Sequence, residues 1–118
     1  LNYDYIGAPW PKEWEKIMDS PSRVGNGGFS LRSKKIMETV SKLEYNPQYN
    51  STADRTEDNF ICLQNFHLLQ TMGIKFAPVE LASKFSFENP TEENSIDNTF
   101  GFHGRHPLVH KYLQKLYV

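Results

Sequence analysis

The stretch VGNGGFSLRSKKIMETVSKL, residues 24–43, runs from a glycine-rich segment through a short strand into a helix. Ser33 stands where an N-cap is expected, because a serine side chain can accept a hydrogen bond from the free N–H groups of a first helical turn. A strand followed directly by an amphipathic helix is typical of α/β proteins. The apolar residues of the predicted helix share one face, at Ile36, Met37, Val40 and Leu43.

The rest of the chain repeats this alternation, so the predicted fold class is α/β. About four short strands are fewer than the roughly five or six of an average sheet, so we expect an incomplete sheet. The helix at 58–71 carries apolar residues nearly all round, which predicts a buried position, and Gly73 is placed to end it. Further strands are predicted at 3–7, 74–76 and 100–103, helices at 12–18, 78–85 and 107–117, and polar loops at 44–56 and 87–98.

The length of 118 residues allows one domain, 1–118, because domains usually have about 100–150 residues. Thirteen Lys and Arg against 14 Asp and Glu leave a formal charge of −1, which gives no electrostatic basis for binding nucleic acid or an anionic membrane. No apolar run reaches the roughly 18 residues of a membrane span. The single cysteine, Cys62, lies in an apolar helical stretch, which predicts a buried, unreactive thiol and does not assign a compartment.

A glycine cluster stands at Gly25, Asn26, Gly27 and Gly28. Glycines let a backbone approach a ligand closely and present its N–H groups to phosphate oxygens. The pattern is not a P-loop, because no Gly-Lys-Ser/Thr follows, and Ser30 replaces the third glycine of a dinucleotide fingerprint. A tight hairpin turn at Asn26-Gly27 is the structural alternative.

Thr56-Glu57-Asp58 stands at the start of the predicted central helix. The helix dipole stabilises carboxylates in a first turn, and this capping role alone would explain them. Two carboxylates held before a buried helix can also serve catalysis. One could act as a general base on a hydroxyl while the other holds the substrate.

Three histidines, His103, His106 and His110, fall close together. His106 and His110 have the i, i+4 spacing that can bind a metal, but His106 precedes Pro107, which favours a helix boundary. His103 ends a predicted strand between two glycines, which leaves space around its ring. A single histidine needs metal ligands from elsewhere.

The N-terminal segment is unusually aromatic, with Tyr3, Tyr5, Trp10 and Trp14. Packing in the core is one interpretation of these rings. A platform on which a sugar or a base stacks is the other, because a flat apolar ring fits the face of a pyranose.

These motifs occur in one order: YDYIGAPW at 3–10, VGNGGFSLRS at 24–33, EDNF at 57–60, FAPVELA at 76–82, FSFE at 85–88 and FGFH at 100–103. In this order they resemble a largely uncharacterised family of glycosyltransferase-like proteins over nearly the whole chain. That family is similar to the second half of a GT-A nucleotide-sugar glycosyltransferase. The resemblance implies a partial GT-A-like fold, its C-terminal portion, with an incomplete mixed sheet and flanking helices.

A GT-A core has a DxD metal motif, a glycine-rich loop, an acidic xED motif and a C-terminal histidine, in that order. The resemblance makes Gly25 to Gly28 the loop beside donor and acceptor. Trp10, from the aromatic N-terminal segment, is a further candidate substrate contact. It makes Asp58 the catalytic base, Glu57 an acceptor contact, and His103 a metal ligand. No DxD motif precedes Tyr3. We therefore expect the donor half to lie upstream of Leu1 and the 118-residue chain alone to be inactive.

The implied activity of the full-length protein is sugar transfer from a nucleotide-sugar donor to the hydroxyl of a carbohydrate or other acceptor, with inversion. Manganese or magnesium is the implied cofactor, because a divalent cation stabilises the leaving diphosphate. A non-catalytic module that binds a glycan or a protein through Trp10 and Trp14 is the alternative. A small metal protein that uses His103, His106 and His110 is a third hypothesis.

Overall fold

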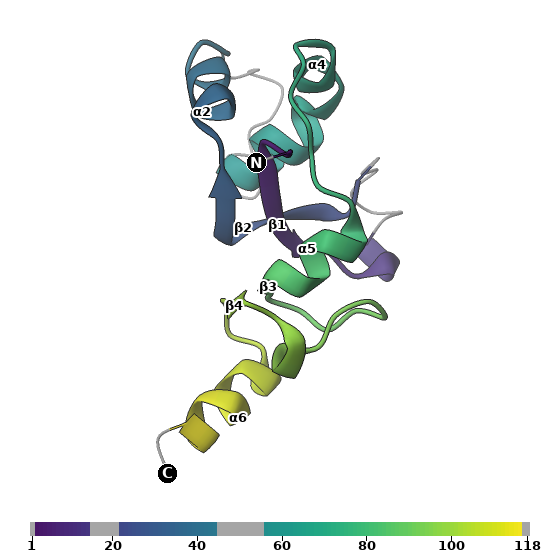
Figure 1. Ribbon diagram of the computed structural model, residues 1–118, viewed down its shortest axis with the longest axis vertical. Coiled ribbons are helices and arrows are strands. Elements are labelled where there is room, and N and C mark those ends of the chain that lie inside the picture. Colours follow the sequence, from purple (N-terminus) through teal and green to yellow (C-terminus); the bar gives the residue numbers. More distant parts are fainter. Residues whose placement is uncertain (1, 15–21, 45–55, 117–118) are drawn as a thin grey trace.

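The computed structural model describes residues 2–14, 22–44 and 56–116, and its principal extents are 46 × 32 × 24 Å. Figure 1 shows two helices, α2 and α4, at one end, strands β1 and β2 with α5 in the middle, and α6 at the other end. Helices and short strands alternate, which confirms the α/β class. The elements are β1 Tyr5–Pro9, β2 Val24–Arg32, α2 Lys34–Val40, α3 Glu57–Asn59, α4 Phe66–Thr71, α5 Val79–Phe85, β3 Ser86–Phe87, β4 Gly101–Phe102 and α6 Pro107–Leu116, with the short helices η1 Lys12–Trp14, η3 Phe60–Gln64 and η4 Ile96–Asn98.

Strand β1 is the centre of the fold, and all of its residues are buried. It pairs antiparallel with β2 along one edge, and Tyr5 forms a parallel bridge with Phe76 along the other. The predicted boundaries, 3–7, are two residues too early. Proline cannot donate a backbone hydrogen bond, but its carbonyl can still accept one, so Pro9 can stand as the last residue of the strand. It is paired with Val24. The apolar cluster around β1 consists of Tyr5, Ile6, Trp10, Val24, Ile36, Ile61, Cys62, Leu69, Ile74, Ala77 and Ala82.

The predicted incomplete mixed sheet is divided in the described residues, which form two sheets of two strands each. Strands β1 and β2 are antiparallel, whereas β3 and β4 are parallel. The predicted strand at 74–76 is reduced to the bridge of Phe76. Strand β3 was missed because two residues are too few to show a hydrophobic period, and η4 lies inside the predicted loop at 87–98.

The predicted continuous helix at 58–71 is broken into α3, η3 and α4. Its middle part, η3, is a π-helix, and Asn65 follows it with non-helical dihedral angles of −114° and 11°. The backbone N–H of Asn65 donates to the Phe60 carbonyl at 3.1 Å, and the Asn65 side-chain amide donates to the same oxygen at 2.9 Å. This doubled bond over five residues widens the turn and ends the α-helical ladder.

The predicted helix ends are confirmed where a local signal exists. The Ser33 hydroxyl accepts from the N–H of Ile36 at 3.1 Å, although α2 ends at Val40, before Leu43. Gly73 follows α4 with a φ of 85°, in the left-handed region that favours glycine. His106 lies at the start of α6, where its Nδ1 accepts from the N–H of Leu108 at 3.1 Å. Within the described part of the chain, no helix is long and apolar enough to cross a membrane.

The predicted loop at 44–56 and the end of the predicted helix at 12–18 lie mostly outside the described residues.

Cys62 is fully buried, as predicted, and burial raises the pKa of its thiol. A thiol kept protonated in this way is a poor nucleophile.

A nearly buried ion pair joins Arg23, which directly precedes β2, to the segment after β3. The Arg23 guanidinium contacts both carboxylate oxygens of Glu93, at 2.7 and 3.1 Å. These hydrogen bonds from Arg23 lower the pKa of Glu93 from 4.5 to about 2. The side chains are only 10% and 23% exposed, so water screens the pair weakly.

Glu93→Gln should lower the free energy of unfolding at neutral pH by about 3 kcal/mol, because it removes the charge that Arg23 binds. A lowered carboxyl pKa stabilises the fold above the unfolded value, and this contribution is lost as the pH falls from about 4.5 toward 2. Urea unfolding of both proteins between pH 7 and pH 3 measures it, and the difference between them should shrink with acid.

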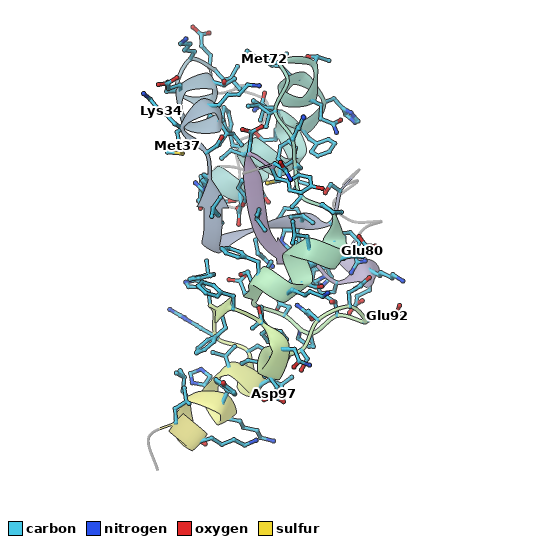
Figure 2. The ribbon with its side chains drawn as sticks, viewed as in Figure 1. Lys34, Met37, Met72, Glu80, Glu92 and Asp97 are labelled. Atoms are coloured by element: carbon cyan, nitrogen blue, oxygen red, sulfur yellow. The ribbon has the colours of Figure 1, made fainter. Side chains whose placement is uncertain are left out.

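Glu92→Gln is the matched control, because Glu92 pairs with Lys12 at 2.8 Å in the open, with side chains 76% and 54% exposed. Figure 2 shows Glu92 pointing outward from the same segment. Its loss should cost less than about 0.5 kcal/mol. Equal effects of the two substitutions would contradict the importance of the Arg23 pair.

Candidate functional site

The glycine cluster lies within strand β2, so the tight turn considered for Asn26-Gly27 is wrong. Among the described glycines, only Gly73 and Gly104 have positive φ. The strand is instead bulged against β1. Gly7 alone separates Ile6 from Ala8 on β1, whereas residues 27–30 separate their partners on β2. The bulge frees the backbone of these residues from regular pairing, so it can meet side chains from other elements.

Asp58 reaches this bulge from α3. The N–H of Gly27 donates to Asp58 Oδ2 at 3.4 Å, and the N–H of Asn59 donates to Oδ1 at 2.8 Å. The Asp58 side chain is therefore held by backbone groups of two elements, and the residue remains partly exposed. A carboxylate that is fixed and still open to solvent can accept a proton from a substrate hydroxyl.

Glu57 lies beside Asp58 and is bound by Arg32, a residue that the sequence prediction missed. Arg32 Nη2 donates to Glu57 Oε1 at 3.3 Å, with side chains 20% and 60% exposed. The Arg32 guanidinium also lies 5.5 Å from the centroid of the Tyr5 ring, which fixes its orientation. A Cβ at Gly27 would lie 2.6 Å from Arg32 and 2.9 Å from Glu57. Glycine at position 27 therefore leaves the space that this pair occupies.

His103 reaches the same strand from the end of β4. A Cβ at Gly28 would lie 2.0 Å from His103 Nδ1, so the imidazole occupies the space beside this glycine. Its Nδ1 is 2.8 Å from Glu88 Oε1, a second partner that the sequence prediction missed. With Nδ1 on a carboxylate, Nε2 is the nitrogen left for a ligand, which is the usual arrangement of a metal-binding histidine. The imidazole is 54% exposed.

Two neighbouring glycines of one strand thus contact two of the predicted site residues, the predicted base Asp58 at Gly27 and the predicted metal ligand His103 at Gly28. The described residues contain no group of three or more His, Cys, Asp and Glu side chains that could hold a metal ion. The hypothesis of a metal site made of His103, His106 and His110 is therefore wrong in this structure.

Trp10 is buried, with 3% of its surface exposed, and its ring fills the space beside Gly25. Its indole N–H donates to Asn26 Oδ1 at 2.8 Å. The packing interpretation therefore describes Trp10 in this structure, and no face of its ring is open for stacking. Trp10 acts on the site indirectly, because it holds Asn26 and Gly25 in place. Trp14 is 36% exposed.

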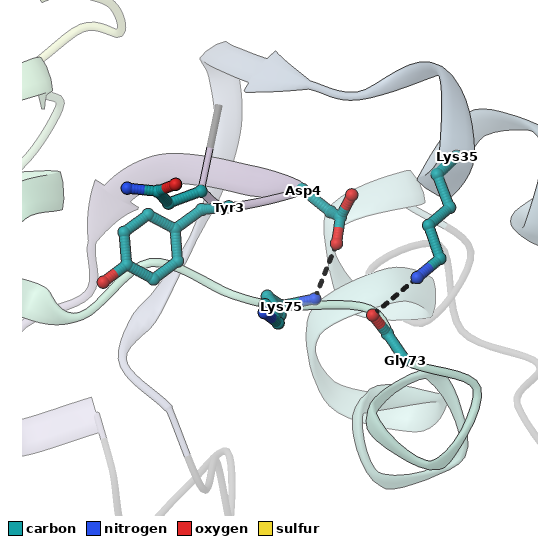
Figure 3. A pocket seen from close by; sticks show the side chains of 6 residues that line it. Tyr3, Asp4, Lys35, Gly73 and Lys75 are labelled. Atoms are coloured by element: carbon teal, nitrogen blue, oxygen red, sulfur yellow. Dashed lines mark hydrogen bonds between the residues drawn. The ribbon is translucent and has the colours of Figure 1, made fainter.

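A separate polar pocket of about 460 Å³ lies at the start of β1, and none of the predicted site residues lines it. The backbone N–H of Lys75 donates to Asp4 Oδ2 at 2.8 Å, and the ammonium group of Lys35 donates to the Gly73 carbonyl at 2.8 Å. Both hydrogen bonds are drawn in Figure 3. The Ser33 hydroxyl donates to the other Asp4 oxygen at 2.6 Å. Burial raises the pKa of Asp4, but these hydrogen bonds outweigh it and hold the pKa below its usual value. Asp4 thus joins β1 to α2 and to the segment after α4.

The fold and this site define an α/β protein in which an acidic pair and a histidine contact neighbouring glycines of a bulged strand. The chain belongs to the family described as Protein of unknown function (DUF5672), whose model matches residues 1–103. The match includes every residue of the site, from Tyr5 to His103, and ends before α6. Comparison with curated proteins and with solved structures found no match.

Proposed function

We propose that this chain is the acceptor-side part of a GT-A-like glycosyltransferase, which transfers a sugar from a nucleotide-sugar donor to an acceptor hydroxyl. One observation carries the proposal. Glu57-Asp58 and His103 are 45 residues apart in sequence at their nearest, and both reach adjacent glycines of β2. This is the grouping that the order of motifs implies for such an enzyme.

In the proposed reaction, Asp58 takes the proton of the acceptor hydroxyl as the hydroxyl oxygen attacks the anomeric carbon of the donor sugar. The bond from that carbon to the nucleoside diphosphate breaks, and the diphosphate leaves with the electron pair. The configuration at the carbon is inverted. Glu57, held by Arg32 at 3.3 Å, lies beside the base and is placed to contact the acceptor.

A divalent cation, manganese or magnesium, would stabilise the negative charge of the leaving diphosphate when bound. His103 fits as one of its ligands, because Glu88 occupies Nδ1 and leaves Nε2 open. Its other ligands would have to come from outside the described residues.

The proposal is tested on the protein expressed with its whole natural sequence. It is incubated with nucleotide-sugars, manganese or magnesium, and mixed acceptor glycosides, and release of nucleoside diphosphate is measured with and without acceptor. We expect release that depends on one donor and on the acceptor. A protein that neither turns over nor binds any nucleotide-sugar would refute the proposed function.

His103→Ala should raise the metal concentration needed for half-maximal transfer by about tenfold or more, because it removes one ligand of the cation. A metal titration of the transfer rate measures this shift. His110→Ala is the matched control, since His110 is an exposed histidine on α6. An unchanged titration in His103→Ala would remove His103 from the metal site.

A further inference from the structure

A cluster of three aromatic rings lies beside the candidate site. The Phe85 and Phe100 rings stack with centroids 5.8 Å apart and planes at 11°, and Phe29 contacts them at 5.3 and 6.2 Å. The Phe100 side chain is 80% exposed, the most of any large apolar residue described. Its backbone N–H is fixed on the Lys84 carbonyl at 2.9 Å, so α5 holds this exposed ring in position.

The aromatic cluster is continuous with the site through two reciprocal contacts. The His103 ring fills the space beside Gly28, and the Phe29 ring fills the space beside Gly101, where a Cβ would lie 2.2 Å from it. Strand β2 thus provides Gly28 and the Phe29 ring, and the segment 101–103 provides Gly101 and the His103 ring. Gly28 and Phe29 are neighbours in the chain, so the contact with His103 and the aromatic cluster lie one residue apart along β2. A molecule bound at His103 can therefore extend onto the aromatic cluster.

The groove in front of Phe100 has the chemistry of an apolar binding surface. Its volume is about 250 Å³, and it is lined by Leu81, Lys84, Phe85 and Phe100. The lining is almost entirely apolar, because Lys84 contributes the methylene groups of its side chain. A sugar in this groove would leave its hydroxyl groups without partners, so the groove selects an aromatic or aliphatic group.

We infer that this groove binds the apolar part of the acceptor, an aryl or alkyl group attached near the hydroxyl that receives the sugar. The inference rests on the proposed function, because it assigns the groove to the acceptor of that reaction. Phe100 supplies the stacking surface, and Phe29 links it to the glycine strand. The enzyme would then prefer glycosides or alcohols with an apolar substituent over free sugars.

The test compares phenyl β-D-glucopyranoside with methyl β-D-glucopyranoside as probes, with the whole natural protein and binding measured by calorimetry. We expect the phenyl glycoside to bind about tenfold more tightly, as one aromatic contact allows. Phe100→Ser should abolish this preference. Met37→Ser is the matched control, because Met37 is 53% exposed on α2 at the far end of the molecule (Figure 2).

Equal affinities for the two glycosides, or a phenyl preference that survives Phe100→Ser, would overturn the inference. A fall of more than about 5 °C in the melting temperature of Phe100→Ser would also overturn it, because an open ring stabilises little and such a fall means that protein covers it. Sugar transfer without a phenyl preference overturns this inference alone. A phenyl preference that depends on Phe100, without any nucleotide-sugar binding, overturns the proposed function and leaves an aryl-binding groove.

Discussion

Asp58→Asn is expected to lower the rate of sugar transfer by about 10²–10⁴-fold, the usual contribution of a general base. Asparagine has nearly the same shape as aspartate, and its one side-chain oxygen can keep the stronger bond, from the N–H of Asn59 at 2.8 Å. Only the longer contact with the N–H of Gly27, at 3.4 Å, is lost to the amide group. An amide cannot take the proton of the acceptor hydroxyl. The fold and the binding of the nucleotide-sugar should therefore persist while the chemical step is lost.

The measurement is kcat for transfer, with donor binding and the melting temperature as parallel readouts. Glu80→Gln is the matched control, because Glu80 is also a carboxylate in a first helical turn, but it points outward from α5 (Figure 2). Glu57→Gln should raise the KM of the acceptor more than it lowers kcat. Near-normal kcat in Asp58→Asn would show that Asp58 is not the base, even if the protein is a glycosyltransferase.

The parts of the fold that the sequence predicts correctly depend on local chemistry. Ser33 caps α2 through its own hydroxyl, Gly73 supplies a φ of 85°, and His106 stands at the start of α6. Each of these needs only neighbouring residues, so a single sequence contains the signal. The break at Asn65 comes from its two hydrogen bonds to the Phe60 carbonyl, which the apolar periodicity of the helix does not show. The short strand β3 depends on pairing with β4, a segment farther along the chain.

The residues of the candidate site also separate into those that the sequence could predict and those that it could not. Asp58 and His103 could be chosen from the sequence because of their residue types and the order of motifs. Their partners Arg32 and Glu88 could not, because each acts through a contact with a residue far away in the chain. Both partners do belong to the quoted motifs, at 24–33 and 85–88. A charged residue near the end of each motif was the sequence signal that could have pointed to these two partners.

Trp10 illustrates the limit of composition as a guide. An aromatic-rich segment predicts either a core or an open stacking surface, and the sequence does not distinguish them. In the structure Gly25 decides the question, because its missing side chain lets the Trp10 ring pack against the strand. The open aromatic surface lies elsewhere, at Phe100.

Gly25→Ala is therefore expected to destabilise the fold strongly. The new Cβ would lie 2.0 Å from Trp10 Cη2, and the buried Trp10 cannot move away, because its indole N–H is bound to Asn26 and its backbone N–H to Arg23. Overpacking a core usually costs 1–3 kcal/mol, and a contact this short on a fixed ring should cost about 3 kcal/mol or more. Urea unfolding measures this loss.

Gly28→Ala is the control that separates the two roles of the glycine strand. Its Cβ would also lie 2.0 Å from a ring, that of His103, but this ring is 54% exposed and can swing outward. We expect a loss of less than about 1 kcal/mol, since exposed side chains move at little cost. The His103 contact with Glu88 should break. Under the proposed function, the metal concentration needed for half-maximal transfer should then rise, as in His103→Ala. Equal stability losses at Gly25 and Gly28 would contradict this division, in which Gly25 serves the core and Gly28 positions His103.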